Sequence, residues 1–226
     1  MTSSPVAESA PQFKRLVRAH KWGAALKVAA TKFGPKISES LLFARIGETL
    51  VEADMVAVAE TCFEEGLTRW PDDIWLLYHY ANLATFYRTS EVAFPRWQDL
   101  ISRHPGSPLG ICGMAVLRQV RGDDPGAEAL FADATGLFPD YVWAADGYAN
   151  SAARREDWPT ALVRWIDVIQ RFPGHQRAYE QTVRALVELQ DFEAARVAVC
   201  RGIEAFPASP TLLAQSEVIM TRLAGG

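Results

Sequence analysis

Residues 142–175 read VWAADGYANSAARREDWPTALVRWIDVIQRFPGH, and this stretch contains two short helical patterns. The first half places small or aromatic side chains on one helix face, at Ala145, Tyr148, Ala149 and Ala152. The second half does the same with Ala161, Trp165, Val168 and Ile169. A charged segment separates the halves, and Pro173-Gly174 ends the second, because proline interrupts a helix and glycine tolerates the turn that follows. The stretch predicts a helical hairpin.

This hairpin recurs along the chain in strict register. Five prolines stand at one constant interval of 34 positions, at Pro71, Pro105, Pro139, Pro173 and Pro207. Twelve positions before each proline is an alanine: Ala59, Ala93, Ala127, Ala161 and Ala195. Eight positions before each is a larger apolar residue: Phe63, Trp97, Phe131, Trp165 and Val199. Small and large residues that alternate at fixed positions indicate close helix packing repeated five times.

The pattern resembles the tetratricopeptide repeat, a helix-turn-helix unit of about 34 residues with small residues at helix crossings, an aromatic second helix and a closing proline. The resemblance covers five copies, 40–73, 74–107, 108–141, 142–175 and 176–209. It implies an all-α fold, a right-handed α-solenoid of stacked hairpins in which each repeat touches only its neighbours. Residues 11–39 resemble a degenerate basic repeat. We expect a disordered tail at 1–10 and a C-terminal capping helix and tail at 210–226.

The register also predicts where each helix lies. First helices are expected at 40–53, 74–87, 108–121, 142–154 and 176–189, and second helices at 56–69, 90–103, 125–137, 159–171 and 193–205. Two earlier helices are expected at 12–20 and 22–33, and a last one at 210–223. Pro125 and Pro159 fit a first helical turn, where the missing N–H costs nothing, whereas Pro95 lies deeper and predicts a local irregularity.

The expected helices occupy residues 11–223 and leave no room for a catalytic domain. The sequence lacks a glycine-rich phosphate loop, a histidine pair at metal-binding helical spacing and a nucleophile elbow. Cys62, Cys112 and Cys200 fall in different repeats, which favours reduced structural thiols over disulfides or a zinc site. We therefore expect a protein that is not an enzyme and that binds no cofactor and no metal.

Charge is distributed unevenly along the chain. The segment 1–36 holds seven basic residues against one acid, a charge of +6, and the segment 37–226 holds 16 arginines against 26 acids, a charge of -10. The basic patch consists of Lys14, Arg15, Arg18, Lys21, Lys27 and Lys32. It is either a solvated terminal repeat or a docking site for an anionic partner. The acidic main body argues against nucleic acid as a partner.

Targeting and membrane signals are not apparent in the sequence. No apolar run reaches the roughly 18 residues that are needed to cross a bilayer. The segment 1–11 is small and polar and does not resemble a signal peptide. A cytoplasmic protein without membrane insertion is the default expectation.

The resemblance implies that first helices line a concave groove and second helices form the outer face. Groove positions are then expected at offsets of 30, 27, 26 and 23 before each proline. They hold Leu41, Ala44, Arg45 and Glu48; Trp75, Tyr78, His79 and Asn82; Leu109, Cys112, Gly113 and Val116; Trp143, Asp146, Gly147 and Asn150; Arg177, Glu180, Gln181 and Arg184. Only three of these are basic, which argues against the recognition of terminal carboxylates known in this family.

Two pairs of groove residues recur two repeats apart, Trp75 with Trp143 and Asn82 with Asn150. Asparagine offers a donor and an acceptor to the main chain of an extended peptide, and aromatic side chains concentrate interface energy. The alternative is that the tryptophans pack between first helices while the asparagines cap helices or face water. The candidate binding residues are Trp75, Tyr78, His79, Asn82, Phe86, Cys112, Trp143, Asp146, Asn150, Arg154, Arg177, Glu180 and Arg184.

Three functions fit these observations. The leading hypothesis is a non-catalytic adaptor that binds a peptide or protein segment in the groove. A second is an accessory or targeting subunit of a transferase that modifies proteins or glycans. A third is self-assembly, with the apolar stripe of the helix at 212–223 buried against another copy.

The repeated packing positions give a direct test of the expected architecture. Ala161→Leu should lower the free energy of unfolding by about 1–3 kcal/mol through overpacking, and Trp165→Ala by about 3–5 kcal/mol through cavity formation. Thermal or urea unfolding of both variants measures these costs. Two variants that unfold like the wild type would show that the small and large positions have been misassigned.

Overall fold

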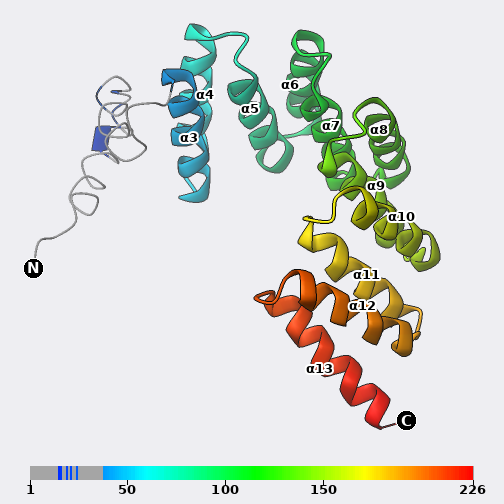
Figure 1. Ribbon diagram of the computed structural model, residues 1–226. Helices are drawn as coiled ribbons and strands as arrows, with labels where there is room; N and C mark the ends of the chain where they lie inside the picture. Colours follow the sequence, from blue (N-terminus) through cyan, green and yellow to red (C-terminus); the bar gives the residue numbers. More distant parts are fainter. Residues whose placement is uncertain (1–14, 17–18, 20, 22–23, 25–37, 226) are drawn as a thin grey trace, which may run out of the picture. The chain divides into compact units, whose positions relative to one another are not determined.

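Helices joined by short loops make up the chain in the computed structural model, which describes residues 15–16, 19, 21, 24 and 38–225 (Figure 1). The chain divides into two compact units, 1–120 and 121–226. The first contains α3 (Glu39–Glu52), α4 (Val56–Arg69), α5 (Ile74–Tyr87), α6 (Ser90–Arg103) and α7 (Pro108–Val120). The second contains α8 (Asp124–Leu137), α9 (Val142–Arg154), α10 (Trp158–Arg171), α11 (Gln176–Glu188), α12 (Phe192–Ala205) and α13 (Pro210–Ala224).

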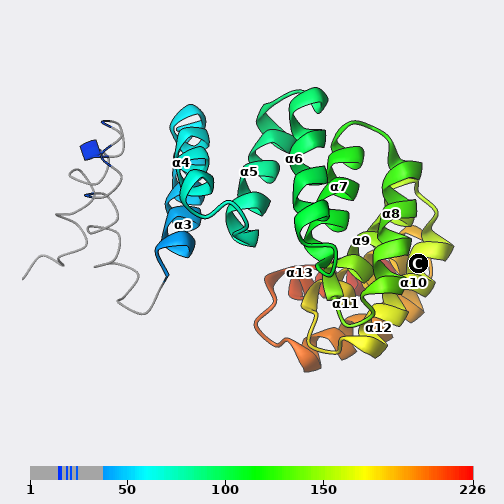
Figure 2. The ribbon, with the colours of Figure 1, turned by 90° about the horizontal axis from the view of Figure 1, so that it is seen from above.

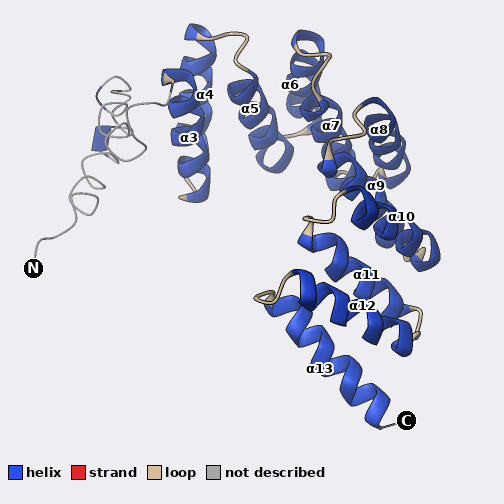
Figure 3. Cartoon of the chain, in the orientation of Figure 1, coloured by secondary structure: helices blue, strands red, loops and turns tan. Residues whose placement is uncertain are grey.

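The all-α helical-repeat architecture expected from the sequence is confirmed. Over the described ranges there are helices and loops but no strands (Figure 3), and each helix from α3 onward begins and ends within one residue of its expected limits. Among these described helices, none combines the length and the apolar character needed to cross a bilayer. The expected helices at 12–20 and 22–33 and the tail at 1–10 lie almost wholly outside the described residues.

Within each unit, helices pack as antiparallel neighbours along the chain. In the first unit α3 pairs with α4 and α5 with α6, and the first helices α3, α5 and α7 also contact one another in order (Figure 2). In the second unit α9 lies against α10, and α11 packs against α10, α12 and α13. Each hairpin therefore covers the apolar face of the next, as a stack of repeats requires.

The turns before α8, α10 and α12 share one design. Asp123, Asp157 and Asp191, which stand 34 positions apart, each accept a hydrogen bond from the backbone N–H three residues later, at 2.9, 3.3 and 3.0 Å. The bonds from Thr160 lower the pKa of the Asp157 carboxyl. The residue before each aspartate has positive φ, +83° at Gly122 and about +60° at the other two positions. This left-handed residue followed by an N-cap aspartate lets the second helix start immediately after the turn.

Two residues that interrupt the repeat pattern are accommodated without disturbing it. The expected irregularity at Pro95 does not occur, because α6 runs unbroken from Ser90 to Arg103. His104 replaces the aromatic residue found before the other closing prolines, and its Nε2 lies 2.9 Å from the carbonyl oxygen of Asp72. His104 therefore braces the preceding inter-repeat loop.

The alternating small and large positions form the core. The five alanines twelve positions before the prolines are all 0% exposed, and the larger residues eight positions before the prolines are at most 3% exposed. Glycine allows some of the rings to approach a first helix directly: a Cβ on Gly113 would lie 2.1 Å from Trp97, and one on Gly147 would lie 2.2 Å from Phe131. Any side chain at these two glycines would push neighbouring repeats apart.

A partly buried arginine joins consecutive second helices at two places, and we refer to each arrangement as an Arg clamp. In the first unit Arg96 lies 3.5 Å over the Tyr80 ring, donates to the Tyr80 carbonyl oxygen at 3.2 Å and pairs with Glu60 at 2.5 Å. In the second unit Arg164 stands over Tyr148 at 3.7 Å and pairs with Glu128 at 2.7 Å.

The electrostatics of the first clamp favour an ionised glutamate. Burial alone would raise the pKa of Glu60, but hydrogen bonds from Arg88 and Arg96 outweigh it and lower that pKa below its usual value. The corresponding residues of the two clamps stand 68 positions apart, Glu60 with Glu128, Tyr80 with Tyr148 and Arg96 with Arg164. The helix pair therefore repeats every 34 residues, whereas the Arg clamp recurs after 68 residues, an interval of two repeats.

The two buried tryptophans differ in how their indole N–H is satisfied. Trp97 Nε1 donates to Thr85 Oγ1 at 2.8 Å. Twelve positions before Trp165 the chain has Ala153 in place of a threonine, and Trp165 Nε1 is buried with no hydrogen-bond partner among the described residues. A buried donor without an acceptor costs about 1–3 kcal/mol, so the fourth repeat is less well satisfied than the second.

This difference predicts the effect of one substitution. Thr85→Val preserves side-chain shape but removes the acceptor, and it should lower the free energy of unfolding by about 1–3 kcal/mol. In a Trp97→Phe background the same substitution should cost less, because the indole donor is already gone. Urea unfolding of the four proteins in this cycle measures the coupling. Equal costs of Thr85→Val in both backgrounds would contradict the assigned hydrogen bond.

Candidate functional site

The first-helix face of unit 1 exposes an aromatic cluster on α5. Trp75 is 45% exposed and meets Tyr78 edge-on, with ring centroids 6.3 Å apart. Tyr78 in turn packs edge-on against the buried Trp97 at 5.7 Å. The exposed indole is therefore held by a ring that is itself anchored in the core. Trp75 accordingly does not have the buried position between first helices that was the alternative expectation for it.

A cavity of about 300 Å³ lies beside this cluster, between α3 and α5. Four candidate residues line it together: Tyr78, His79, Asn82 and Phe86. Phe63 is also part of the lining and packs under the His79 ring, with centroids 6.1 Å apart and planes 7° from parallel. Phe86 is 56% exposed at the edge. The structure thus brings these α5 residues into one concave, largely aromatic site with an amide among the rings.

The α5 side of the cavity is uncharged, and its α3 side is acidic. Burial lowers the pKa of His79, which keeps its imidazole neutral near pH 7. Burial also raises the pKa of Tyr78, so its hydroxyl stays protonated. Glu48 and Glu52 of α3 lie in the lining, and Arg45 pairs with Glu48 at 3.0 Å. Such a site suits an apolar side chain accompanied by a donor or a cation.

The first-helix face of unit 2 is arranged differently, around a closed polar network. Asp146 is 3% exposed, accepts from His175 Nε2 at 2.7 Å and pairs with Arg177. The other terminal nitrogen of Arg177 donates to the Asn150 amide oxygen at 3.1 Å. Arg177 therefore ties together two candidate residues of α9, and the amide nitrogen of Asn150 is left without a hydrogen bond to the described chain.

Trp143 stands at the edge of this network. Its side chain is 54% exposed and meets the His175 ring edge-on at 5.4 Å. Trp143 thus occupies the same position in its repeat as Trp75 and is similarly exposed. The two tryptophans share an exposed position, but their surroundings differ, aromatic in unit 1 and ionic in unit 2.

The remaining candidates of unit 2 form contacts within the chain. Glu180 accepts hydrogen bonds from Gln176 at 2.7 Å and from Ser209, the N-cap of α13, at 2.9 Å. Arg154 pairs with Asp124 of α8 at 2.7 Å. Arg184 stands 5.3 Å over the Trp158 ring. These residues brace neighbouring helices, and partner contact through them stays a prediction.

Cys112 lies within α7 and is 8% exposed. Burial raises the pKa of its thiol to about 12. Cys62 is 0% exposed, and burial with the nearby Glu65 raises its pKa to about 12 as well. Neither thiol is a nucleophile at neutral pH, because the thiolate is the reactive form.

Some of the positions that were predicted to line the groove are buried instead. The positions at offset 26 before each proline were expected in the groove, yet Gly113 and Gly147 are buried beneath aromatic rings of the preceding hairpins. Ala44, at offset 27 before its proline, is likewise 0% exposed. Glycine at the same position in two of five repeats was the available signal, because glycine inside a helix often marks close packing.

The basic patch is only partly visible. Arg15 and Lys21 are exposed, whereas Lys14, Arg18, Lys27 and Lys32 lie outside the described residues. A docking role for this patch stays a prediction.

The structure is similar to a thermophilic tetratricopeptide-repeat protein of Thermus thermophilus, with a TM-score of 0.62 and 16% identity over 80% of this chain and 99% of that protein. The chain has the tetratricopeptide-repeat fold. Another solved tetratricopeptide-repeat protein, from Parabacteroides merdae, gives a TM-score of 0.61 and 16% identity, with 96% of this chain and 86% of that protein covered. Yeast Tom70 gives 0.72 and 12% identity over 90% of this chain but only 47% of its own length.

No protein-family model and no curated protein sequence matches the chain. At the identities found among solved proteins the likeness concerns the tetratricopeptide-repeat fold. The comparisons therefore do not identify a partner for this chain.

The burial of two thiols gives a prediction with an internal control. Treated with iodoacetamide at about pH 8, the exposed Cys200 should be alkylated quickly. The buried Cys62 and Cys112 should react only after denaturation, because a pKa of about 12 leaves roughly one thiol in ten thousand ionised at that pH. Peptide mass spectrometry reads each site separately. Fast alkylation of Cys112 in the folded protein would show that the α7 face is open.

Proposed function

We propose that this chain is a non-catalytic interaction scaffold whose first-helix face binds a peptide or protein segment. The observation that carries the proposal is the exposed Trp75 beside the cavity lined by Tyr78, Asn82 and Phe86. Exposed aromatic side chains next to a concave site are where binding energy concentrates, and a folded chain gains no stability from exposing them.

The segment best suited to this site carries a large apolar residue near a basic one. The aromatic walls would enclose the apolar side chain, and Glu52 of α3 would face the cation, since Glu48 is already paired with Arg45. The Asn82 amide would hydrogen-bond the main chain between them. The similarity of fold supports this proposal. The solved protein YrrB is a tetratricopeptide-repeat protein with a TM-score of 0.53 to this chain, and it is described as having an unusual peptide-binding site.

The other two hypotheses stay predictions. Self-association through α13 has one observation in its favour, the exposure of Leu213, Val218 and Met220 at 45%, 55% and 54%. A role as accessory subunit of a transferase depends on a partner enzyme, and no residue of the described chain favours it.

Partner capture from cell lysate, with quantitative mass spectrometry, tests the proposed site. A variant carrying Trp75→Ala, Asn82→Ala and Phe86→Ala should lose about 90% or more of its bound partner, since hot-spot truncations cost about 2 kcal/mol or more each. Val92→Ala is the matched control, because Val92 is an exposed apolar residue of the second helix α6. It should leave capture unchanged. A triple variant that melts like the wild type and still retains its partners would refute the site.

A further inference from the structure

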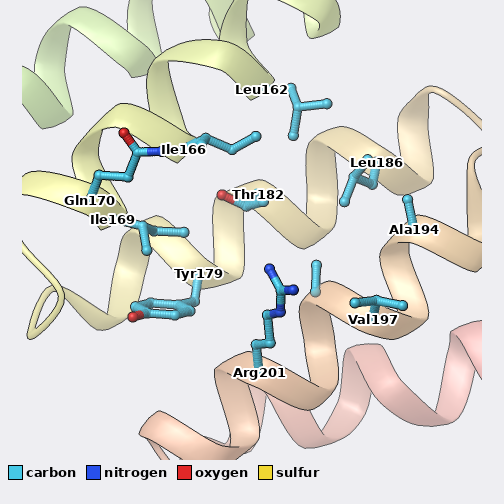
Figure 4. A pocket seen from close by; sticks show the side chains of 11 residues that line it. Leu162, Ile166, Ile169, Gln170, Tyr179, Thr182, Leu186, Ala194, Val197 and Arg201 are labelled. Carbon is cyan, nitrogen blue, oxygen red and sulfur yellow. The ribbon is translucent and has the colours of Figure 1, made fainter.

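A larger cavity lies on second-helix surfaces, away from the first-helix candidates. It occupies about 550 Å³ between α10 and α12, with α11 at its floor (Figure 4). The lining is aliphatic over most of its surface, with Ile166 and Ile169 from α10, Leu186 from α11 and Val197 from α12. A volume of this size is typical of ligand-binding sites, so the cavity can hold several side chains.

The cavity exists because three residues of the Arg clamp are replaced at this junction. One repeat earlier, Glu128, Tyr148 and Arg164 fill the corresponding space between α8 and α10. The residues 34 positions later are Leu162, Thr182 and Ala198, and all three line the cavity. Loss of the long arginine and of the tyrosine ring leaves the groove open. The same fold therefore closes this groove at one junction and opens it at the next.

Arg201 gives the cavity its charge. The four residues at its position in the earlier repeats are acidic, Glu65, Asp99, Asp133 and Asp167. Three of these acids pair with an arginine one turn later, at 2.6, 2.7 and 2.9 Å. Arg201 reverses the sign at this position, and it makes no ion pair with a residue of the described chain. Figure 4 shows its guanidinium directed into the space between Tyr179, Thr182 and Val197.

The two hydroxyl groups of the lining already have acceptors. The Thr182 hydroxyl already donates to the Ala178 carbonyl at 2.8 Å, and the Tyr179 hydroxyl donates to the Pro173 carbonyl at 3.2 Å. Arg201 is exposed beside these apolar walls, and it is the charged residue of the lining. A carboxylate satisfies it best, because planar guanidinium and carboxylate groups form paired hydrogen bonds.

The apolar surface extends beyond the cavity. Ile166 and Val197, on opposite walls, are 41% and 45% exposed, and Val163, one turn from Ile166 on α10, is 69% exposed. The lining residues follow helical spacing, 162, 166 and 169 on α10 and 194, 197 and 201 on α12. Two such ridges with apolar residues at helical spacing suit the apolar face of an amphipathic helix, and they extend beyond what a small carboxylate would cover.

We propose that the α10–α12 trough binds an amphipathic helix of a partner protein, with aliphatic or aromatic residues in the cavity and an aspartate or glutamate paired with Arg201. This site is separate from the first-helix sites proposed above. A partner can therefore engage it while a peptide occupies the other face.

A displayed library of helical peptides about four turns long, roughly 15 residues, tests this proposal. Peptides are selected on the full chain and counter-selected on a variant that carries the clamp, Leu162→Glu, Thr182→Tyr and Ala198→Arg. Enriched peptides should have apolar residues at helical spacing and an acid beside them. No enrichment, or enriched peptides without an acid, would overturn the proposal. If the triple variant does not fold, Ala198→Arg alone replaces it.

Charge reversal then tests the role of Arg201. In fluorescence anisotropy with one enriched peptide, exchange of its acid for lysine should weaken binding to the wild type by about tenfold or more. Arg201→Glu should invert that preference, and Val92→Ala, at an exposed apolar residue of the second helix α6, should leave binding unchanged. Equal affinities of both peptides for wild type and Arg201→Glu would overturn the proposal. So would decanoate binding at this site when no peptide binds, because the occupant would then be a small carboxylate.

Discussion

Aromatic rings of the second helices pack directly against glycines of the first helices, and this contact sets the distance between neighbouring helices. A Cβ on Gly47 would lie 2.2 Å from Phe63, and similar clashes would occur at Gly113 and Gly147. The alanines twelve positions before the prolines are equally inaccessible, at 0% exposure in every repeat. Because close-packed interiors do not yield to an added methyl group, these contacts hold each period at the same length. The turns, caps and closing prolines then follow at fixed offsets.

Outside these contacts the residue types differ from one repeat to the next, and the Arg clamp recurs at an interval of two repeats. The Arg clamps link α4 to α6 and α8 to α10, each with an arginine less than one-fifth exposed. A buried charge is tolerated only when it is paired and hydrogen-bonded, which the glutamate and the tyrosine carbonyl supply. Leucine, threonine and alanine at the next junction require no such compensation. They leave an apolar trough, so the same backbone presents a sealed surface at one place and an open one at another.

The sequence predicted the helices and the core because small and large residues recur at a constant interval of 34 positions. Repeated packing of the same helix pair is the simplest explanation of such a constant interval. It did not predict the clamps, since Glu60, Tyr80 and Arg96 lie on three helices and each residue type is common on helix surfaces. The polar network of unit 2 was missed for a similar reason. Asn150 was predicted to hold a peptide main chain, but Arg177, from the following first helix, reaches its amide oxygen. The cluster on α5 could be predicted more easily, because its aromatic residues and Asn82 lie on one face of a single helix.

The α5 cavity and the α10–α12 trough differ in the charge that a binding partner would need to carry. On α5 the exposed rings lie beside two acids of α3, and the partly buried histidine is neutral. Glu48 pairs with Arg45, so Glu52 is the acid of this lining without an ion pair to the described residues. In the α10–α12 trough the unmatched charge is the guanidinium of Arg201, at a position where four other repeats have an acid. Arg201 is exposed, so a partner that covers the apolar walls beside it would also have to supply a counter-charge in place of water. The opposite signs imply that one ligand would not satisfy both surfaces, which argues for two different partner segments on one scaffold.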